Sequence, residues 1–360
     1  FSSNHAMAAT FNQMVHKTNV VTNKVWQIKF NKGINEDNLS ESVMVFDTRG
    51  IKAKINLSYN AINNTIKVEP PDTGYIEGQT YSLHIYDTLM DVNKSPLKEP
   101  TIMNFTIEVP DNGQRVNSYN RKYNYEQYDK TLEQMVAMQS KVVPVNVVPK
   151  YSLPASDIDI SEYLNPKNFE NHDYAVYQFL TLNYIEGITG ENLNLELGGV
   201  LGSQGQIFLD ACKKYDVNPA YVVAHSILET GNGTSELATG VDVSEVGGKK
   251  VVEKTTYNMF GIGAKDANAI KLGSERAYTE GWFTVEAAIE GGIKYISSDY
   301  INNSTGKQNT LYKMRWNPQN PATHQYASDI GWAFKQSYMM KEILDKYKNA
   351  QLVFEIPQYK

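Results

Sequence analysis

The chain has almost no cysteine. Its 360 residues include only Cys212, so a disulfide framework within the chain and a cysteine-based zinc site are both excluded. Cys212 lies in an apolar stretch, where Phe208, Ala211 and Tyr215 fall on the same face of a predicted helix. We therefore expect its thiol to pack in a core rather than to act as a nucleophile.

Signatures of metal and cofactor chemistry are also missing. The six histidines include no close pair and no His-Glu-x-x-His motif. A Walker loop, a dinucleotide-binding fingerprint and a Gly-x-Ser-x-Gly nucleophile elbow are absent from the sequence as well. The sequence thus predicts an activity that needs no metal and no other cofactor.

The charge pattern and the hydrophobic pattern exclude two further classes of partner. Asp and Glu number 40 against 34 Lys and Arg, a formal net charge of −6, and no basic stripe or tail stands out, which argues against nucleic acid. No apolar run reaches the roughly 18 residues of a membrane-spanning helix. The sequence shows no signal peptide at its start, which fits a cytosolic protein or a mature secreted fragment. A monomer is the default expectation.

Tyrosine is abundant, with 24 residues. Its side chain combines an apolar ring with a polar tip, which suits carbohydrate surfaces as well as ordinary cores.

Residues 24–110 alternate apolar and polar side chains with a period of two. This pattern predicts six or seven short strands, separated by turn sequences such as 47–50, 60–64 and 70–74. Segments 25–33, 77–81 and 103–107 resemble bacterial immunoglobulin-like modules of surface proteins. We therefore expect an all-β immunoglobulin-like sandwich over residues 21–110.

The segments on either side of this sandwich are expected to be less regular. Residues 1–20 carry no pattern and are predicted to be disordered or a linker. Residues 111–165 are polar and rich in Tyr and Asn at first, and we interpret them as a linker that merges into the next domain. From about residue 166 the apolar period becomes helical, which predicts a second domain over 166–360.

One predicted helix in this domain delivers a carboxylate. Asn218 and Pro219 form a typical helix start, and residues 220–228 have almost no polar face, so the helix should run through a core. It ends at Glu229, before Gly231 and Gly233. Burial and the negative end of the helix dipole should raise the pKa of Glu229. A carboxyl group with a raised pKa suits a general acid that protonates a glycosidic oxygen.

The surrounding sequence strongly resembles glycoside hydrolase family 73, the endo-β-N-acetylglucosaminidases of bacterial autolysins. The resemblance covers roughly residues 165–360 and is closest to the glucosaminidase modules of clostridial and staphylococcal autolysins. It rests on segments 224–238, 257–264, 278–282, 300–303, 308–318, 323–327 and 356–360. It implies a mainly α, lysozyme-like (α+β) catalytic domain with a small β-hairpin lobe.

The family resemblance also implies roles for particular residues. Glu229 matches the catalytic acid, and Tyr300 matches a supporting tyrosine near the catalytic centre. Aromatic faces on which sugar rings can stack, and glycines that let the backbone approach a sugar, complete the expected cleft. The substrate-binding residues predicted in this way are Tyr257, Asn258, Phe260, Gly261 and Trp282. Phe260 is the member of this set that we most expect in the core.

A second carboxylate is not identified by any motif. Residues 241–254 are predicted to form a β-hairpin around Gly247-Gly248. It carries Asp242, Glu245 and Glu253, and Asp266 follows it. Any of these could be the second acid, and our choice is Glu253 or Asp266. A nucleophile would lie roughly 5–5.5 Å from the acid, and a base that activates water roughly 6.5–9.5 Å. Alternatively, the N-acetyl oxygen of the substrate could act as the nucleophile, and neither a carboxylate nucleophile nor a carboxylate base would then be needed. All three routes stay open, and we favour one in which Glu229 alone is indispensable.

The expected function is that of a secreted, cell-wall-associated peptidoglycan hydrolase, an autolysin whose partner is the glycan strand. The resemblance implies cleavage of the β-1,4 bond between GlcNAc and MurNAc. One alternative is a lytic transglycosylase, which also depends on a single glutamate. The other is a non-catalytic protein that binds cell-wall glycan without cutting it.

Overall fold

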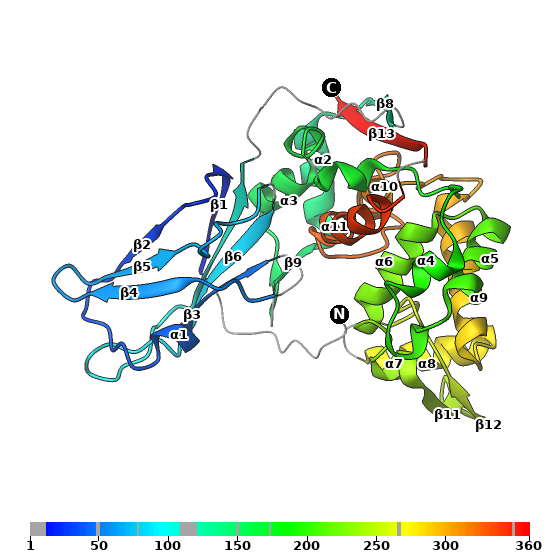
Figure 1. Cartoon of the computed structure of the whole chain (residues 1–360), viewed down its shortest axis with the longest axis horizontal. Coiled ribbons are helices and arrows are strands. Elements are labelled where there is room, and N and C mark those ends of the chain that lie inside the picture. The colour runs from blue at the N-terminus through cyan, green and yellow to red at the C-terminus, as the bar shows by residue number, and fades with distance from the viewer. Residues whose placement is uncertain are drawn as a thin grey trace.

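The computed structural model describes residues 12–47, 51–77, 79–108, 121–148, 151–172, 174–264, 268–347 and 350–360. Two bodies follow one another along the chain (Figure 1). The first is made of strands, and the second consists mainly of helices with a hairpin at its edge.

Seven strands form the two sheets of the first body. One sheet has the order β1 (Asn12–Val20), β7 (Thr101–Ile107), β6 (Thr80–Ile85) and β3 (Val43–Asp47). The other has the order β2 (Trp26–Lys29), β5 (Thr65–Glu69) and β4 (Asn56–Asn60), and the short helix α1 (Leu39–Ser42) precedes β3. Val43, Val45, Ile66, Val68 and Phe105 are fully buried between the sheets. The predicted β-sandwich is confirmed.

The first strand corrects one sequence-based prediction. Residues 1–20 were expected to be disordered or a linker, but β1 occupies residues 12–20 and pairs in parallel with β7. Val20 is buried in the core of the sandwich. A parallel partner that lies far along the chain leaves no local signal, which is why the apolar period alone missed this strand.

The expected linker 111–165 is also structured differently from residue 121 onward. β8 (Arg121–Tyr128) pairs in parallel with the last strand, β13 (Leu352–Tyr359), in unbroken register. The pair lies together at the edge of the helical body (Figure 1). It is followed by α2 (Leu132–Gln139), η1 (Ser140–Val142), β9 (Val145–Val148), β10 (Tyr151–Pro154) and α3 (Asp157–Leu164). This segment therefore belongs to the second domain.

Packing and charge hold this segment in place. Met135, Ile160 and Leu164 are fully buried in the core of the second domain. The Lys313 ammonium, which is 8% exposed, lies 2.8 Å from Glu126 of β8 and 2.6 Å from Glu355 of β13. A buried ammonium needs such partners because an unpaired charge would be costly to desolvate.

The remaining elements surround one central helix, α6 (Pro219–Thr230). They are η2 (Pro166–Asn168), η3 (Ala175–Phe179), α4 (Gly190–Asn194), η4 (Gly199–Leu201), α5 (Gly205–Tyr215), α7 (Glu236–Thr239), α8 (Ala269–Glu280), α9 (Val285–Ile296), η5 (Ser297–Ile301), α10 (Leu311–Trp316) and α11 (Trp332–Leu344). β11 (Val241–Val246) and β12 (Lys249–Thr256) form the antiparallel hairpin that Gly247-Gly248 predicted. α6 packs against α5 and α11. Cys212 of α5 is fully buried and unbridged, and burial raises the pKa of its thiol.

The ends of α6 follow the sequence closely. The Asn218 side chain accepts hydrogen bonds from the backbone N–H groups of Ala220 and Tyr221, at 2.9 and 3.4 Å. Pro219 occupies the first turn, where its missing N–H costs nothing. Gly231 ends the helix in the left-handed conformation, with φ of +56°. From Pro219 to Ser226 every residue is buried, so the helix runs through the core as predicted.

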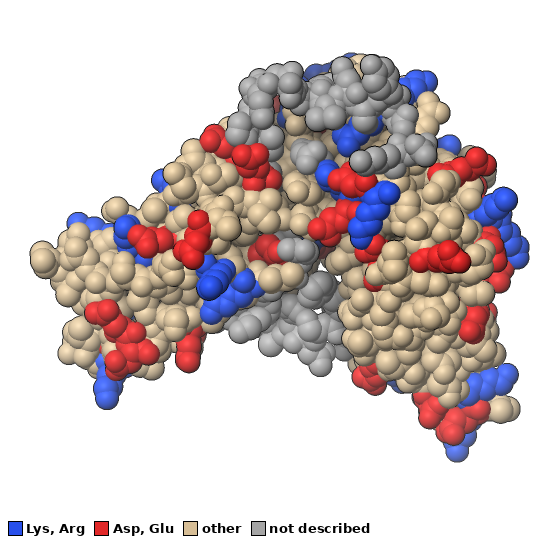
Figure 2. Space-filling model, in the orientation of Figure 1, with Lys and Arg blue, Asp and Glu red and all other residues tan. Residues whose placement is uncertain are grey.

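Small groups of acidic and of basic side chains are scattered over both bodies among larger areas of other residues on the face that Figure 2 shows. Within the described residues, none of the helices has the length and apolar character required to cross a membrane.

Candidate active site

Glu229 lies in the last turn of α6, at the point where the buried helix reaches the surface. Its side chain is 25% exposed. One carboxyl oxygen, Oε1, lies 3.5 Å from Nε2 of His225, which is one turn earlier on the same helix. The other oxygen, Oε2, faces the backbone of Gly261, where an added Cβ would sit 3.0 Å from it. The carboxyl group is thus held between a histidine and a backbone without a side chain.

The turn that follows Glu229 is held rigidly. The Thr230 hydroxyl accepts a hydrogen bond from the N–H of Gly233 at 2.7 Å and donates one to the carbonyl of Ser226 at 2.5 Å. The side chain of Asn232 accepts a hydrogen bond from the N–H of Gly198 at 2.8 Å. These bonds fix the end of α6, and therefore the backbone that carries Glu229.

The pKa of Glu229 corrects the expectation from sequence. Burial has the largest single effect and raises the pKa, as predicted. The hydrogen bond and the charge of His225, together with a smaller contribution from another positive charge, lower it by more in sum, so the pKa lies below its ordinary value. His225 lies four residues before Glu229 and therefore on the same face of the helix, but the balance between these effects follows only from the folded structure.

Asn258 shapes the loop that faces Glu229. Its carbonyl oxygen accepts hydrogen bonds from the N–H groups of Phe260 and Ile262, at 3.3 and 3.2 Å. Its amide nitrogen donates to the carbonyls of Ile262 and Gly273, at 2.8 and 3.2 Å. The side chain is 1% exposed. Asn258 therefore orders the loop from inside and has no polar atom left for the direct sugar contact that was expected.

Two of the predicted stacking residues lie in the core. Phe260 is 1% exposed and meets the His225 ring edge to face, with centroids 5.6 Å apart. Trp282 is 3% exposed and lies so close to α9 that a Cβ on Gly291 would sit 2.0 Å from its indole nitrogen. The expected sugar-stacking role of Trp282 is therefore wrong, because its faces are covered by protein. Tyr257 is half-buried and keeps part of its surface exposed.

A Trp282→Ala variant is expected to lose stability rather than affinity for glycan. Removal of a buried indole leaves a cavity and lowers the free energy of unfolding by about 3–5 kcal/mol. Urea denaturation measures this loss. A folded variant with a normal unfolding midpoint and a raised KM for glycan would instead support sugar stacking on Trp282.

Tyr300 lies in the π-helical turn η5 and meets two residues of the 317–331 segment. Its ring stacks on His324, with centroids 4.6 Å apart, and meets Tyr326 edge to face at 5.1 Å. Tyr326 in turn lies 5.0 Å from the ring of His225. Burial and the nearby Asp299 raise the pKa of Tyr300 to about 12, so its hydroxyl stays protonated at neutral pH. A chain of rings thus connects Tyr300 to the histidine beside Glu229.

His324 and Asp299 are functional candidates that sequence reasoning missed. His324 Nδ1 lies 2.7 Å from the side-chain oxygen of Gln308, and Nε2 lies 3.7 Å from the Asp299 carboxylate. Both side chains are about two-fifths exposed, at 44% and 40%. The 323–327 motif was part of the family resemblance, but only folding places its histidine on Tyr300.

Hydrogen bonds from buried side chains hold the segment that carries His324 and Tyr326 in place. Buried Arg315 donates hydrogen bonds to the carbonyls of Asp329 and Ser328, at 2.7 and 3.0 Å. The side chain of Gln139, in the expected linker, accepts one from Gln325 at 2.6 Å and donates one to the carbonyl of Trp316 at 2.9 Å. Helix α2, which was expected to belong to a linker, therefore supports one side of the site.

The candidates for a second carboxylate differ in what the structure describes. Glu253 is exposed on β12, and its part in the reaction stays a prediction. Asp266 lies outside the described residues. Within the described residues, no three His, Cys, Asp or Glu side chains gather in a group that could hold a metal ion.

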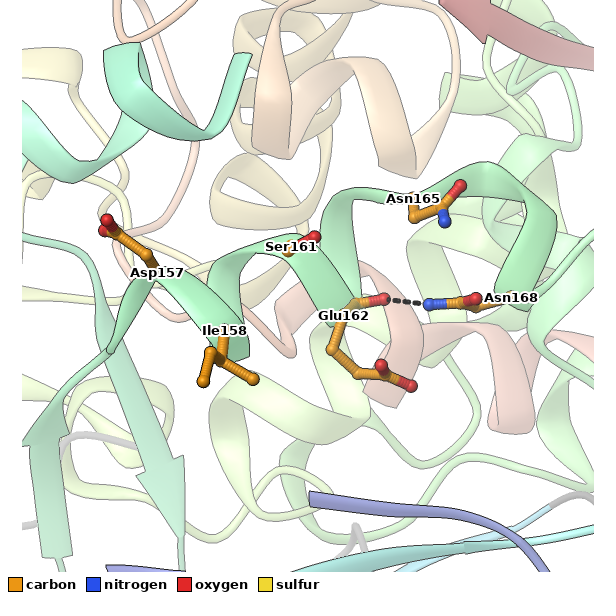
Figure 3. Close-up of a pocket in the computed structure, with 6 residues that line it drawn as sticks. All are labelled: Asp157, Ile158, Ser161, Glu162, Asn165 and Asn168. Atoms are coloured by element: carbon orange, nitrogen blue, oxygen red, sulfur yellow. Dashed lines mark hydrogen bonds between the residues drawn. The ribbon is translucent and has the colours of Figure 1, made fainter. Parts of the chain in front are cut away.

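A separate pocket of about 380 Å³ lies on α3 and η2 (Figure 3). Its lining residues are Asp157, Ile158, Ser161, Glu162, Asn165 and Asn168. The amide of Asn168 donates to the backbone carbonyl of Glu162 at 2.9 Å, which ties η2 to α3. None of these elements carries Glu229, Gly261 or Tyr300, so the pocket is not part of the site.

These features define a class of protein. A buried helix ends in a partly exposed glutamate, which lies beside a glycine backbone and a cluster of tyrosines. The domain that holds this site is mainly helical and carries a β-hairpin. This is the architecture of a lysozyme-like glycoside hydrolase. A family profile described as mannosyl-glycoprotein endo-beta-N-acetylglucosaminidase matches residues 205–345, and a bacterial Ig-like domain profile matches residues 5–107. The chain belongs to the glucosaminidase family and carries an N-terminal bacterial Ig-like domain.

Known relatives agree with this assignment. The beta-N-acetylglucosaminidase of Bacillus subtilis (strain 168) is 43% identical over 212 residues, which are 57% of this chain and 23% of the relative. The chain thus spans less than a quarter of that protein. The crystal structure of S. aureus glucosaminidase B is 34% identical, with a TM-score of 0.52, over 67% of this chain and 95% of the other. A catalytic mutant of S. aureus autolysin E in complex with the disaccharide NAG-NAM is 33% identical, with a TM-score of 0.54, over 65% and 99%.

Proposed function

We propose that the chain is an endo-β-N-acetylglucosaminidase that hydrolyses the β-1,4 bond between GlcNAc and MurNAc in peptidoglycan, with Glu229 as the general acid. The observation that carries the proposal is the position of Glu229. Its backbone is fixed at the end of a buried helix, and its Oε2 lies against the bare backbone of Gly261. A carboxyl group placed in this way can meet a glycosidic oxygen without a side chain between them.

The proton to be transferred is assigned to Oε2. His225 approaches Oε1, and Oε2 faces the loop of Gly261. A bound sugar would displace the water that now reaches the partly exposed carboxyl group. Loss of that water favours the protonated form, which is the form that the acid needs.

Three routes can stabilise the sugar cation: a carboxylate nucleophile, a carboxylate base that activates water, or the N-acetyl oxygen of the substrate. We favour the one in which the N-acetyl oxygen of the substrate attacks and Glu229 alone is indispensable. Tyr300 would support that reaction, because its hydroxyl stays protonated. Its ring contacts Tyr326, which in turn contacts the His225 ring beside the acid.

The substrate class is supported by the relatives. The autolysin E structure holds NAG-NAM, the disaccharide unit that the proposed reaction would cut. The chain is proposed to act as a secreted, monomeric, cell-wall-associated autolysin. The Ig-like domain would then either hold the catalytic domain at a distance from the wall or bind the wall itself.

The test is to identify the new glycan ends. Purified peptidoglycan is digested with the chain, the products are reduced with borohydride, and the ends are identified by mass spectrometry. Reduced GlcNAc is the expected end. Reduced MurNAc would mean that the other glycosidic bond is cut, and anhydro-MurNAc would identify a lytic transglycosylase. Binding to the wall with no new ends at any pH would identify a glycan-binding protein.

A further inference from the structure

We propose that His225 is a positioning residue for the general acid: it donates a hydrogen bond from Nε2 to Oε1 of Glu229, which directs Oε2 toward the substrate and stabilises the carboxylate left after proton transfer. This inference rests on the proposed role of Glu229. It concerns a fully buried side chain that touches neither solvent nor the cleft.

The surroundings of His225 allow little else. Its ring is enclosed by the rings of Phe260, Tyr326 and Trp332, with centroids at 5.6, 5.0 and 5.8 Å, all edge to face. Its Nδ1 lies 3.0 Å from the hydroxyl of Tyr221, one turn earlier on α6. Within the described part of the chain, Nε2 has no hydrogen-bond partner, and Glu229 Oε1 lies 3.5 Å away. A buried polar nitrogen is costly to leave unsatisfied.

The negative charge of Glu229 favours the tautomer that this role requires. The Tyr221 hydroxyl has two acceptors within reach, Nδ1 of His225 at 3.0 Å and Sδ of Met314 at 3.7 Å. If the Tyr221 hydroxyl donates to Nδ1, the imidazole carries its proton on Nε2, and that N–H points to a carboxylate. The reverse arrangement would place a bare nitrogen opposite a negative oxygen, which is repulsive. A movement of the carboxyl group by about 0.5 Å would bring the N···O separation to that of an ordinary hydrogen bond. Catalytic hydrogen bonds are often long before substrate binds.

Apart from Glu229, the titratable groups that face the imidazole are neutral tyrosines. Tyr221 and Glu229 face it from α6, and Tyr326 faces it from the 317–331 segment. Burial raises the pKa of Tyr221 and of Tyr326 well above the ordinary value. Phe260 and Trp332 add no charge.

The balance of effects on Glu229 gives the sign of the pH dependence. Burial raises its pKa, and the hydrogen bond and charge of His225, with a smaller contribution from another positive charge, together lower it by more. Because the acid works only when protonated, activity falls as pH rises through this pKa. Loss of the imidazole removes the two largest effects that oppose burial, so the pKa rises and the alkaline limb of the kcat profile moves to higher pH.

The experiment compares a variant that cannot donate with one that can. His225→Leu removes the donor, whereas His225→Gln places an amide N–H near the position of Nε2. Both are assayed on soluble glycan strands from pH 4 to 9, together with Tyr221→Phe, which removes only the partner of Nδ1. His84→Leu changes a histidine that is equally buried, in β6 of the Ig-like domain, and controls for the general effect of losing a buried imidazole.

For His225→Leu we expect kcat to fall about 10- to 100-fold, the effect of losing one hydrogen bond to a charged group. Its alkaline limb moves to higher pH, and KM changes little. His225→Gln recovers part of kcat and returns the limb toward the parent position. Tyr221→Phe moves the limb in the same direction as His225→Leu but by less, and His84→Leu leaves it in place.

An unshifted alkaline limb in folded His225→Leu, with activity reduced only in proportion to the folded fraction, would overturn the proposal. If His225→Leu does not fold, Tyr221→Phe decides, and an unshifted limb in that variant has the same meaning. Failure of the proposed function has a different signature, since the parent chain itself would then release no reducing GlcNAc.

Discussion

A Glu229→Gln variant releases reducing GlcNAc ends from peptidoglycan roughly 10²- to 10⁴-fold more slowly than the parent chain, the range in which general acids contribute. The amide has the shape of the carboxyl group and can accept the hydrogen bond from His225, but it has no acidic proton. Helix α6 keeps its Asn218 cap and its glycine end, so the fold should survive. Borohydride reduction and mass spectrometry measure the rate.

The matched control for this variant is Glu290→Gln on α9. Glu290 is partly exposed and forms an ion pair with Lys214 at 2.7 Å, so its loss should cost little stability and no activity. A Glu229→Gln protein that matched this control in rate would remove Glu229 from the mechanism. An inactive and unfolded variant would be recognised by circular dichroism and repeated as Glu229→Ala.

A Gly261→Ala variant is expected to lose up to about 10-fold in kcat while it stays folded. The added Cβ would lie 3.0 Å from Oε2 of Glu229, so the carboxyl group must move away from the position that faces the substrate. A misplacement of about 1 Å costs roughly 100-fold, and a shift of a few tenths of an ångström costs correspondingly less. Backbone strain adds to the effect, because Gly261 has a φ of +63° and an alanine there costs about 1–2 kcal/mol.

Strain and displacement can be separated with Gly247→Ala in the turn of the β-hairpin. Gly247 also has a positive φ, +56°, but a Cβ there meets nothing within 4 Å. This variant should lose a similar amount of stability in urea and keep its kcat. Equal losses of activity in the two variants would show that the close approach of Gly261 to Glu229 is unimportant.

Local patterns in the sequence were enough for several elements. The period of two in residues 24–110 predicted the sandwich, because a strand with one buried face needs no distant information to be recognised. Asn218, Pro219 and Gly231 predicted both ends of α6, because each satisfies or removes a backbone group of the helix that carries it. Gly247-Gly248 predicted the hairpin for the same kind of reason.

Other features depended on partners far along the chain. β8 and β1 were missed because each pairs in parallel with a strand that is distant in sequence. Trp282 has the flat aromatic face on which a sugar ring can stack, and only the close approach of Gly291 in the folded chain shows that this ring is covered. Stacking of His324 on Tyr300 likewise requires two segments that the sequence cannot place side by side.

Glu229 illustrates the division most clearly. Helix signals within a dozen residues located it at the end of a buried helix, and the motifs around it placed it in a family, because both depend on the order of neighbouring side chains. Its pKa, its orientation and its neighbours followed only from packing. Electrostatic effects fall off with distance in space, so whether burial or His225 dominates is settled by three-dimensional proximity and not by chain order.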